Sequence, residues 1–366
     1  MIFIILFIAA CFLAYTNGAN DNFKGVATLF GTGTTDYKRA ISWATITTFL
    51  GSVAAIFLAG ALVKNFSGKG LVPDELIQAP EFAISIALGA GITVFLATKI
   101  GMPISTTHGL VGALFGAGVV GVGSDFNFSK LGGTFLFPLV VSPLMAAVVS
   151  LICYLLFTTI RKRIGLSKES CLCMGETINN EAKLTSTLEA TNTLAVKVAT
   201  EKECTEVYLG NFLGINAQKL LDSLHYLSSG VVSFARGLND TPKIVGLLVV
   251  MNTLDIRIGM ISIAIAIAVG GLLNAKKVGE TVSKKITPMN HGQGFTANLV
   301  TGLLVTTASL HGMPVSTTHV SVGSIFGIGT VTKKANLKVV RNILLSWLLT
   351  LPVSAICGGL VYWIIS

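Results

Sequence analysis

The stretch Gly101-Met-Pro-Ile-Ser-Thr-Thr-His-Gly-Leu-Val-Gly-Ala-Leu-Phe-Gly-Ala-Gly118 recurs as Gly312-Met-Pro-Val-Ser-Thr-Thr-His-Val-Ser-Val-Gly-Ser-Ile-Phe-Gly-Ile-Gly329. Twelve of the 18 aligned positions are identical. A second motif, Gly18-Ala-Asn-Asp-Asn-Phe-Lys24, precedes the first copy, and Gly237-Leu-Asn-Asp-Thr-Pro-Lys243 precedes the second. Two different motifs that recur in the same order indicate gene duplication, so the chain is expected to consist of two related halves.

The composition around these motifs is that of a membrane protein. Of 366 residues, 52% are hydrophobic and only 12% are charged, with a mean hydropathy of +0.76. Soluble proteins carry about 25% charged residues, which cover their surface. The net charge of +9 comes from short basic runs between apolar segments, as in membrane loops. The composition therefore predicts an all-α polytopic membrane protein and excludes a cytosolic enzyme, a disordered scaffold and a nucleic-acid-binding protein.

Apolar stretches divide the chain into three parts. A membrane span needs about 20 apolar residues, and the candidates are 1–16 continuing to 33, 41–63, 81–100, 108–123, 133–160, 219–235, 243–252, 258–275, 294–311, 319–332 and 343–366. Several are short or end in Gly or Pro, which is typical of broken helices. Residues 161–210 are polar and hold seven of the 17 acidic residues. We expect a first transmembrane repeat at 1–160, a polar cytoplasmic insert at 161–215 and a second repeat at 216–366.

The distribution of basic residues predicts the orientation. If each Pro-Ser-Thr-Thr-His segment is the tip of a re-entrant hairpin and the N-terminus lies outside, the loops at 34–40, 161–218, 274–293 and 331–342 fall inside. These loops carry most of the lysines and arginines, whereas the opposite loops keep only Lys64, Lys69, Lys130 and Arg257. This asymmetry follows the positive-inside rule. It places both termini outside a cell (inner) membrane and makes the halves inverted repeats, an arrangement typical of secondary transporters.

The two hairpin tips have the residues of an anion site. Proline ends one helix, and Ser or Thr is a favoured N-cap of the next. A helix N-terminus carries partial positive charge and binds anions, and hydroxyl and amide donors suit phosphate. Two such tips from inverted halves are expected to converge on one anion. The alternative is that these hydroxyls bond only to helix carbonyls. The candidate phosphate ligands are Ser105, Thr106, Thr107, Ser316, Thr317 and Thr318.

The shorter motif supplies carboxylates, Asp21 and Asp240, each preceded by Asn20 or Asn239. Each pair follows a glycine at an expected helix break inside an apolar segment, where a carboxylate is costly unless it is paired. Two carboxylates would repel phosphate, so a cation is expected between them. Amide and carboxylate oxygens with unwound carbonyls suit Na⁺. The alternative is that each aspartate pairs with the lysine three residues later along a helix.

Other polar residues allow more than one interpretation. His108 and His319 could shuttle protons or serve as neutral donors at a helix start. Lys99 is expected to extend towards the membrane interface, and the role of Arg236 stays open. Cys171, Cys173 and Cys204 lack the spacing of a zinc site.

With these motifs the chain resembles the inorganic phosphate transporter (PiT) family, which includes animal sodium-dependent phosphate transporters and bacterial phosphate permeases. The resemblance rests on Gly-x-Asn-Asp and Pro-[Ile/Val]-Ser-Thr-Thr-His in each half, and it covers both apolar halves. It implies inverted repeats, a cytoplasmic central loop, outward termini and symport of phosphate with Na⁺ or H⁺. It assigns the same serines and threonines and the same Asn-Asp pairs to phosphate and cation. The chain departs from the family at Asn22-Phe23-Lys24 and at Asn298, where some relatives carry Glu.

The sequence therefore predicts a transporter that imports inorganic phosphate by symport with Na⁺ through alternating access. Its expected partners are phosphate, the coupling ion Na⁺ and the lipid bilayer, with a homodimer as one option for its assembly. An H⁺-coupled symporter of metal-phosphate or of sulfate is the alternative. A channel is disfavoured because the polar residues concentrate at four short breaks. An enzyme is disfavoured because adjacent Thr and His side chains face apart on a helix.

Overall fold

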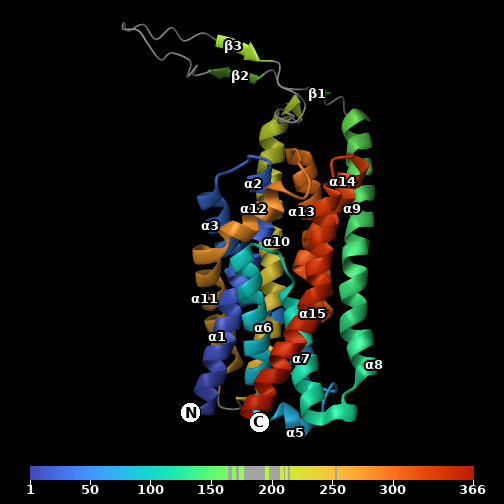
Figure 1. The fold of residues 1–366 in the computed structure, drawn as a ribbon. Helices are drawn as coiled ribbons and strands as arrows, with labels where there is room; N and C mark the ends of the chain where they lie inside the picture. Colours follow the sequence, from blue (N-terminus) through green and yellow to red (C-terminus); the bar gives the residue numbers. More distant parts are fainter. Residues whose placement is uncertain are drawn as a thin grey trace, which may run out of the picture.

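The protein is a bundle of long helices in a computed structural model (Figure 1). The structure describes residues 1–163, 217–251 and 254–366, and six short strands between 167 and 216. Both termini lie at one end of the bundle, and strands β1 to β3 lie at the other. The fold confirms the predicted all-α membrane class.

The first half contains long helices joined by short helical turns. Its elements are α1 (Ile2–Asp21), η1 (Asn22–Val26), α2 (Ala27–Gly31), α3 (Tyr37–Leu58), α4 (Gly60–Phe66), α5 (Asp74–Ile77), α6 (Pro80–Ile100), α7 (Thr106–Val122), η2 (Gly123–Asp125), α8 (Phe128–Lys130), the π-helical η3 (Leu131–Leu136) and α9 (Phe137–Arg163). The chain enters the α6–α7 hairpin beside α5, at the end of the bundle that holds the termini (Figure 1).

The second half contains long helices and fewer short ones. Its elements are α10 (Ala217–Val245), η4 (Gly246–Val250), α11 (Ile256–Asn274), α12 (Lys276–Lys284), α13 (His291–Leu310), α14 (Thr317–Val331) and α15 (Leu337–Ile365). The chain enters the α13–α14 hairpin after α12, at the end where the strands lie (Figure 1).

The insert contains three two-stranded antiparallel sheets. They pair β1 (Ser167–Glu169) with β4 (Val207–Leu209), β2 (Cys173–Glu176) with β3 (Leu194–Lys197), and β5 (Asn211–Phe212) with β6 (Ile215–Asn216). The rest of the insert, including Cys171 and Cys204, lies outside the described residues. The division into three parts stays a prediction.

The contacts between helices follow the repeat. Helix α7 packs on α15 and α14 on α9, while α3 packs on α10 and α11 on α1. Each contact joins one half to the other, and each has its counterpart. Glycines allow the close approach: a Cβ added at Gly116 would overlap the backbone of Ala355, and one at Gly327 that of Ala147. Gly116 and Gly327 therefore lie at helix interfaces.

The predicted hairpin tips are confirmed. Helix α6 ends at Gly101, which adopts the left-handed conformation with φ 76°, and α13 is followed by Gly312 with φ 68°. Positive φ strains most residues with a side chain, so glycine is required at both turns. After each proline, a serine caps the second helix of the hairpin.

The helix breaks match the prediction in one half only. Helix α1 gives way to the 3₁₀ turn η1 directly after Asp21. In contrast, α10 continues as α-helix through Asn239 and Asp240 to Val245, so the expected break there is wrong. A Cβ at Gly237 would overlap the backbone of α3, and the Thr241 hydroxyl donates to Ser52 Oγ over 2.7 Å, so α10 is in close contact with α3 across the motif. A Cβ at Gly18 would overlap the backbone of α11 equally, so close packing occurs in both halves.

Seven helical segments of the described chain are long and apolar enough to cross a membrane, as expected of a multi-pass membrane protein. Helix α10 is not among them, although its 29 residues would extend about 44 Å. It carries Arg236, Asn239, Asp240 and Lys243, all buried, which lower its hydropathy. In contrast to these buried polar residues of α10, large apolar side chains are exposed on the outward faces of α9, α11 and α15, where lipid would cover them.

Candidate ion-binding site

The two hairpin tips meet inside the bundle. The Thr107 hydroxyl donates to the Val315 carbonyl over 3.3 Å, and the Thr318 hydroxyl donates to the Ile104 carbonyl over 3.2 Å. Each tip therefore contacts the backbone of the other in the same way. All six candidate serines and threonines are buried, with at most 6% of any residue exposed. The sequence prediction that the tips converge is confirmed.

At each tip the serine caps a helix and leaves backbone donors without a protein partner. Ser105 Oγ accepts from the His108 N–H over 3.1 Å, and Ser316 Oγ accepts from the His319 N–H over 3.3 Å. In the described chain no partner is found for the four N–H groups of the paired threonines that follow these serines. Two helix N-termini thus bring unpaired donors to one place.

Asp21 is bound from three sides. Its carboxylate accepts from the Lys24 ammonium, from Thr106 Oγ1 over 3.0 Å and from Asn17 Nδ2 over 3.3 Å. The bond from Thr106 connects the end of α1 directly to the first hairpin tip. Asn17 Nδ2 also lies 3.2 Å from Asp240 Oδ2, so one amide group lies between the two carboxylates.

The Lys24 ammonium contacts four oxygens. They are Asp21 Oδ1, Asn20 Oδ1 at 2.9 Å, the Ile104 carbonyl at 2.8 Å and Thr318 Oγ1 at 2.8 Å. The pairing of Asp21 with Lys24, which the sequence left as the alternative, is therefore present in the structure.

The Lys243 ammonium has a corresponding set of contacts in the second half. It lies 3.4 Å from Asp240 Oδ1, 2.7 Å from the Val315 carbonyl and 2.7 Å from Thr107 Oγ1. Each lysine therefore contacts the aspartate and the tip carbonyl of its own half and a threonine of the opposite tip. The carbonyls near the carboxylates come from the tips and not from unwound turns of α1 or α10, which corrects the expectation.

The two asparagines fix the motif helices to the hairpins. Asn20 Nδ2 donates to Thr98 Oγ1 over 2.9 Å and to the Met102 carbonyl over 3.0 Å. Asn239 Oδ1 accepts from Ser309 Oγ over 3.2 Å, and its Nδ2 donates to the Val315 carbonyl over 3.2 Å. Thr98 and Ser309 both lie three residues before the glycine of their tip, so each asparagine bonds to a hydroxyl at the same repeat position. The direction of that bond and the carbonyl partner differ between the halves.

Arg236 breaks this equivalence. It occupies the repeat position of Asn17, and its guanidinium donates to Asn17 Oδ1 over 2.8 Å and to Asn22 Oδ1 over 2.9 Å. Its Nε lies 3.6 Å from Asp240 Oδ2. Arg236 is 1% exposed, so this residue, whose role the sequence left open, belongs to the site. Lys99 is exposed.

All buried charged side chains of the described chain, apart from histidines, lie in this site. There are five, three cationic and two anionic, so the formal net charge is +1. They are Asp21, Lys24, Arg236, Asp240 and Lys243. A buried cationic excess favours the entry of an anion.

Behind the tips, His108 and His319 face each other with ring centroids 4.5 Å apart. His319 also stacks on Trp347 at 3.8 Å, and its Nδ1 lies 3.1 Å from the Leu139 carbonyl. His108 Nδ1 and His319 Nε2 are buried and have no hydrogen-bond partner among the described residues. The two rings therefore pack against each other where the two hairpins meet.

A second polar group surrounds Thr28. Thr28 donates to Asn298 Oδ1 over 2.9 Å and lies 3.0 Å from His225 Nε2. Asn298 Nδ2 is buried and has no hydrogen-bond partner in the described chain.

This group continues through Thr34, whose hydroxyl oxygen lies 3.4 Å from His225 Nδ1 and 3.1 Å from His291 Nδ1. His291 Nδ1 lies 2.6 Å from Asp222 Oδ1. The Asp222 side chain is 37% exposed, so this carboxylate does not belong to the buried charged site.

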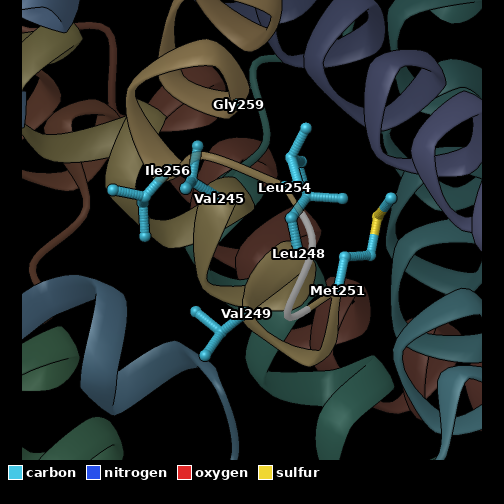
Figure 2. A pocket seen from close by; sticks show the side chains of 7 residues that line it. All are labelled: Val245, Leu248, Val249, Met251, Leu254, Ile256 and Gly259. Carbon is cyan, nitrogen blue, oxygen red and sulfur yellow. The ribbon is translucent and has the colours of Figure 1, made fainter.

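A cavity of about 210 Å³ lies elsewhere, where α10 ends and α11 begins (Figure 2). The described residues that line it are apolar: Val245, Leu248, Val249, Met251, Leu254, Ile256 and Gly259. These described residues provide no side-chain donor for an oxyanion. The cavity is therefore not the candidate site.

A model of the phosphate transporter family matches residues 17–358. The chain belongs to this family. It is 28% identical to a candidate phosphate permease of Pyrococcus furiosus, with 96% of this chain and 93% of the relative covered. It is 29% identical to a candidate phosphate permease of Haemophilus influenzae, with 97% and 94% covered. Among solved structures it is similar to a sodium-dependent phosphate transporter, with a TM-score of 0.77, 25% identity and coverage of 100% and 98%.

For this phosphate transporter family member, the sequence named Lys24 and Lys243 only as alternative partners of the aspartates and left the role of Arg236 open. The structure places all three in the site. Sequence reasoning missed Asn17, which lies between the two carboxylates. Asn17 gave no signal in the repeat, because the equivalent position in the second half is Arg236.

Proposed function

We propose that this phosphate transporter family member imports inorganic phosphate by symport with Na⁺ through alternating access. The observation that carries the proposal is the meeting of two capped helix N-termini, one from each half, in a buried site of net charge +1. Two such N-termini favour a small anion with several oxygens. The TM-score of 0.77 to a sodium-dependent phosphate transporter supports Na⁺ as the coupling ion.

The proposed phosphate ligands are the hydroxyl groups and free N–H groups of the tips. Ser105 and Ser316 use a lone pair to cap their helices and keep an O–H to donate. The hydroxyl groups of Thr107 and Thr318 donate to carbonyls of the opposite tip. Phosphate oxygens would replace those carbonyls as acceptors. The proposed ligand set is Ser105, Thr106, Thr107, Ser316, Thr317 and Thr318.

The proposed Na⁺ ligands are Asn20 and Asp21 in one half and Asn239 and Asp240 in the other. Carboxylate and carbonyl oxygens are hard ligands of the kind that bind small cations. In the structure such oxygens surround the ammonium of Lys24 and of Lys243, which supports a cation at these positions. Phosphate held between two carboxylates needs cations beside it, so neither ion is expected to bind well alone.

We further propose that the two halves are inverted repeats with both termini outside and the insert in the cytoplasm. The matched helix pairs and the entry of the two hairpins from opposite ends support the inversion. The basic residues of α12 and of the end of α9 support a cytoplasmic insert.

Coupling to H⁺ is the second candidate, and the unpartnered ring nitrogens of His108 and His319 are the observation in its favour. The two candidates are separated by labelled phosphate uptake into proteoliposomes. A Na⁺ gradient and a pH gradient are imposed separately. Na⁺ symport predicts accumulation under the Na⁺ gradient at equal pH. Accumulation under the pH gradient alone would instead establish H⁺ coupling.

A further inference from the structure

The two buried lysines have no role in the function proposed above, yet they occupy its centre. Each ammonium touches a carboxylate, a backbone carbonyl and a threonine hydroxyl, and Lys24 also touches an asparagine amide oxygen. These are the oxygens that would bind Na⁺. Lys24 is 4% exposed and Lys243 is 1% exposed, so neither ammonium is held by solvent.

We propose that Lys24 and Lys243 are the residues that couple phosphate to Na⁺. Phosphate draws each ammonium away from its Asn-Asp pair, and Na⁺ then takes the oxygens that the ammonium has left. The inference rests on the proposed function and names the side chains that link the binding of its two ions.

The first step is competition between lysine and Na⁺. The Lys24 ammonium lies within 3 Å of Asn20 Oδ1, the Ile104 carbonyl and Thr318 Oγ1, so a second cation cannot bind the same oxygens. A Na⁺ ion next to the ammonium would also be repelled strongly, because both charges are positive and the site is buried. While the lysines stay in place, Na⁺ is therefore kept from the aspartates.

The second step is the attraction of the lysines by phosphate. The ammonium of Lys24 lies 2.8 Å from Thr318 Oγ1, and that of Lys243 lies 2.7 Å from Thr107 Oγ1. Both hydroxyls are proposed phosphate ligands, so a bound phosphate would be adjacent to both ammonium groups. Lys24 has three N–H donors for four oxygen neighbours, so at least one N–H group is shared between two oxygens. A charged phosphate oxygen is a stronger acceptor than a neutral carbonyl or hydroxyl.

The third step is the cost of leaving a carboxylate alone. When its lysine turns to phosphate, Asp21 keeps only the neutral donors Thr106 and Asn17 among the described residues. Asp240 also keeps Arg236, whose Nε lies 3.6 Å away, so this cost is greatest at Asp21. An uncompensated charge inside a membrane protein is costly, and Na⁺ removes that cost. Phosphate therefore favours Na⁺ binding, and by reciprocity Na⁺ favours phosphate binding. The lysines would thereby prevent either ion from binding well alone.

The test is to measure Na⁺ affinity of purified protein with and without inorganic phosphate, with Na⁺-dependent thermal stabilisation as the readout. The variants are Lys24→Met and Lys243→Met, which keep the length of the side chain and remove the charge. Lys64→Met changes an exposed lysine of α4 and is the matched control. A profile from size-exclusion chromatography establishes that each variant is folded, and the two lysines test the same prediction independently.

In the wild type and in Lys64→Met, we expect saturating phosphate to raise Na⁺ affinity about tenfold or more. In either site variant, we expect Na⁺ to bind without phosphate at least about tenfold more tightly than it binds the wild type, and phosphate to change that affinity less than about twofold. A gain of Na⁺ affinity is not expected from general damage to the fold.

Two results would overturn the inference. One is that phosphate raises the Na⁺ affinity of both site variants as much as it raises that of the wild type. The other is Na⁺ affinity without phosphate that is unchanged or weaker in both. A wild type that takes up phosphate without any dependence on Na⁺ would refute the proposed function itself, and the inference with it. The two failures are thus distinguishable.

Discussion

The ammonium nitrogen of Lys24, in the first half of the chain, lies 2.8 Å from the hydroxyl oxygen of Thr318, in the second half. The repeat-related contact, from Lys243 to Thr107, measures 2.7 Å. These two bonds cross the interface between the halves at the hairpin tips. Rearrangement at the tips would therefore change the environment of both aspartates, which is the coupling that a symporter requires.

Removing the charge of either aspartate is expected to stop transport. Loss of one partner of a buried ion pair costs about 3–5 kcal/mol. A comparable loss in cation binding corresponds to a factor of about a hundred or more. Asp21→Asn and Asp240→Asn should therefore reduce Na⁺-driven phosphate uptake in proteoliposomes at least about a hundredfold.

Asp125→Asn is the matched control, because Asp125 is exposed in η2 at the end of the bundle. It should transport phosphate like the wild type. Undiminished uptake by both site variants would overturn the role given to the aspartates.

Thr107→Val and Thr318→Val remove the hydroxyl groups that link the tips and keep the shape of the side chain. A hydrogen bond to a charged group contributes about 1.5–3 kcal/mol. Each variant should therefore raise the KM for phosphate by a factor of about ten to a hundred. Initial uptake rates over a range of phosphate concentrations measure this, and normal KM values in both would exclude the hydroxyls as ligands.

The contact between α7 and α15 should be sensitive to a single methyl group. Gly116→Ala would place a Cβ against the Ala355 backbone and force the helices apart. Overpacking costs about 1–3 kcal/mol, so the thermal midpoint should fall by several degrees. Gly60→Ala, in α4, is the control, because a Cβ there has no neighbour within 4 Å. Equal midpoints for the two variants would contradict the packing described.

The orientation predicts which side of the membrane a protease reaches. With the insert in the cytoplasm, trypsin should cut within residues 161–215 in inside-out vesicles and leave that segment intact in right-side-out vesicles. The excess of basic residues at that end of the bundle is the physical reason. Cleavage of the insert from outside the cell would reverse the assignment.

Much of the tip structure could be predicted from the sequence because local rules determine it. Gly101 and Gly312 end the first helices through positive φ, and Ser105 and Ser316 cap the second. These effects act within four residues and follow from residue type. The duplication then predicted that the two tips would meet.

The remainder of the site depends on contacts that local spacing does not encode. Arg236 bonds to Asn17 and Asn22, which lie more than 200 positions earlier in the chain. Helix α10 continues through its motif although the motif carries glycine and proline, and there it contacts Ser52 of α3, far away in the sequence. Residue type alone could not decide whether the lysines of the repeated motif lie in the site, because that depends on where the hairpin carbonyls are placed.

Equilibrium binding of labelled phosphate to the purified transporter, at one pH with and without Na⁺, tests the central claim most directly. The claim predicts saturable binding that requires Na⁺ in the wild type and in Thr307→Val, an exposed threonine of α13. It predicts binding at least about tenfold weaker in the double variant Thr107→Val/Thr318→Val. Phosphate binding that is indifferent to Na⁺, or equally tight in the double variant, would contradict a site made by the two helix tips with their accompanying cations.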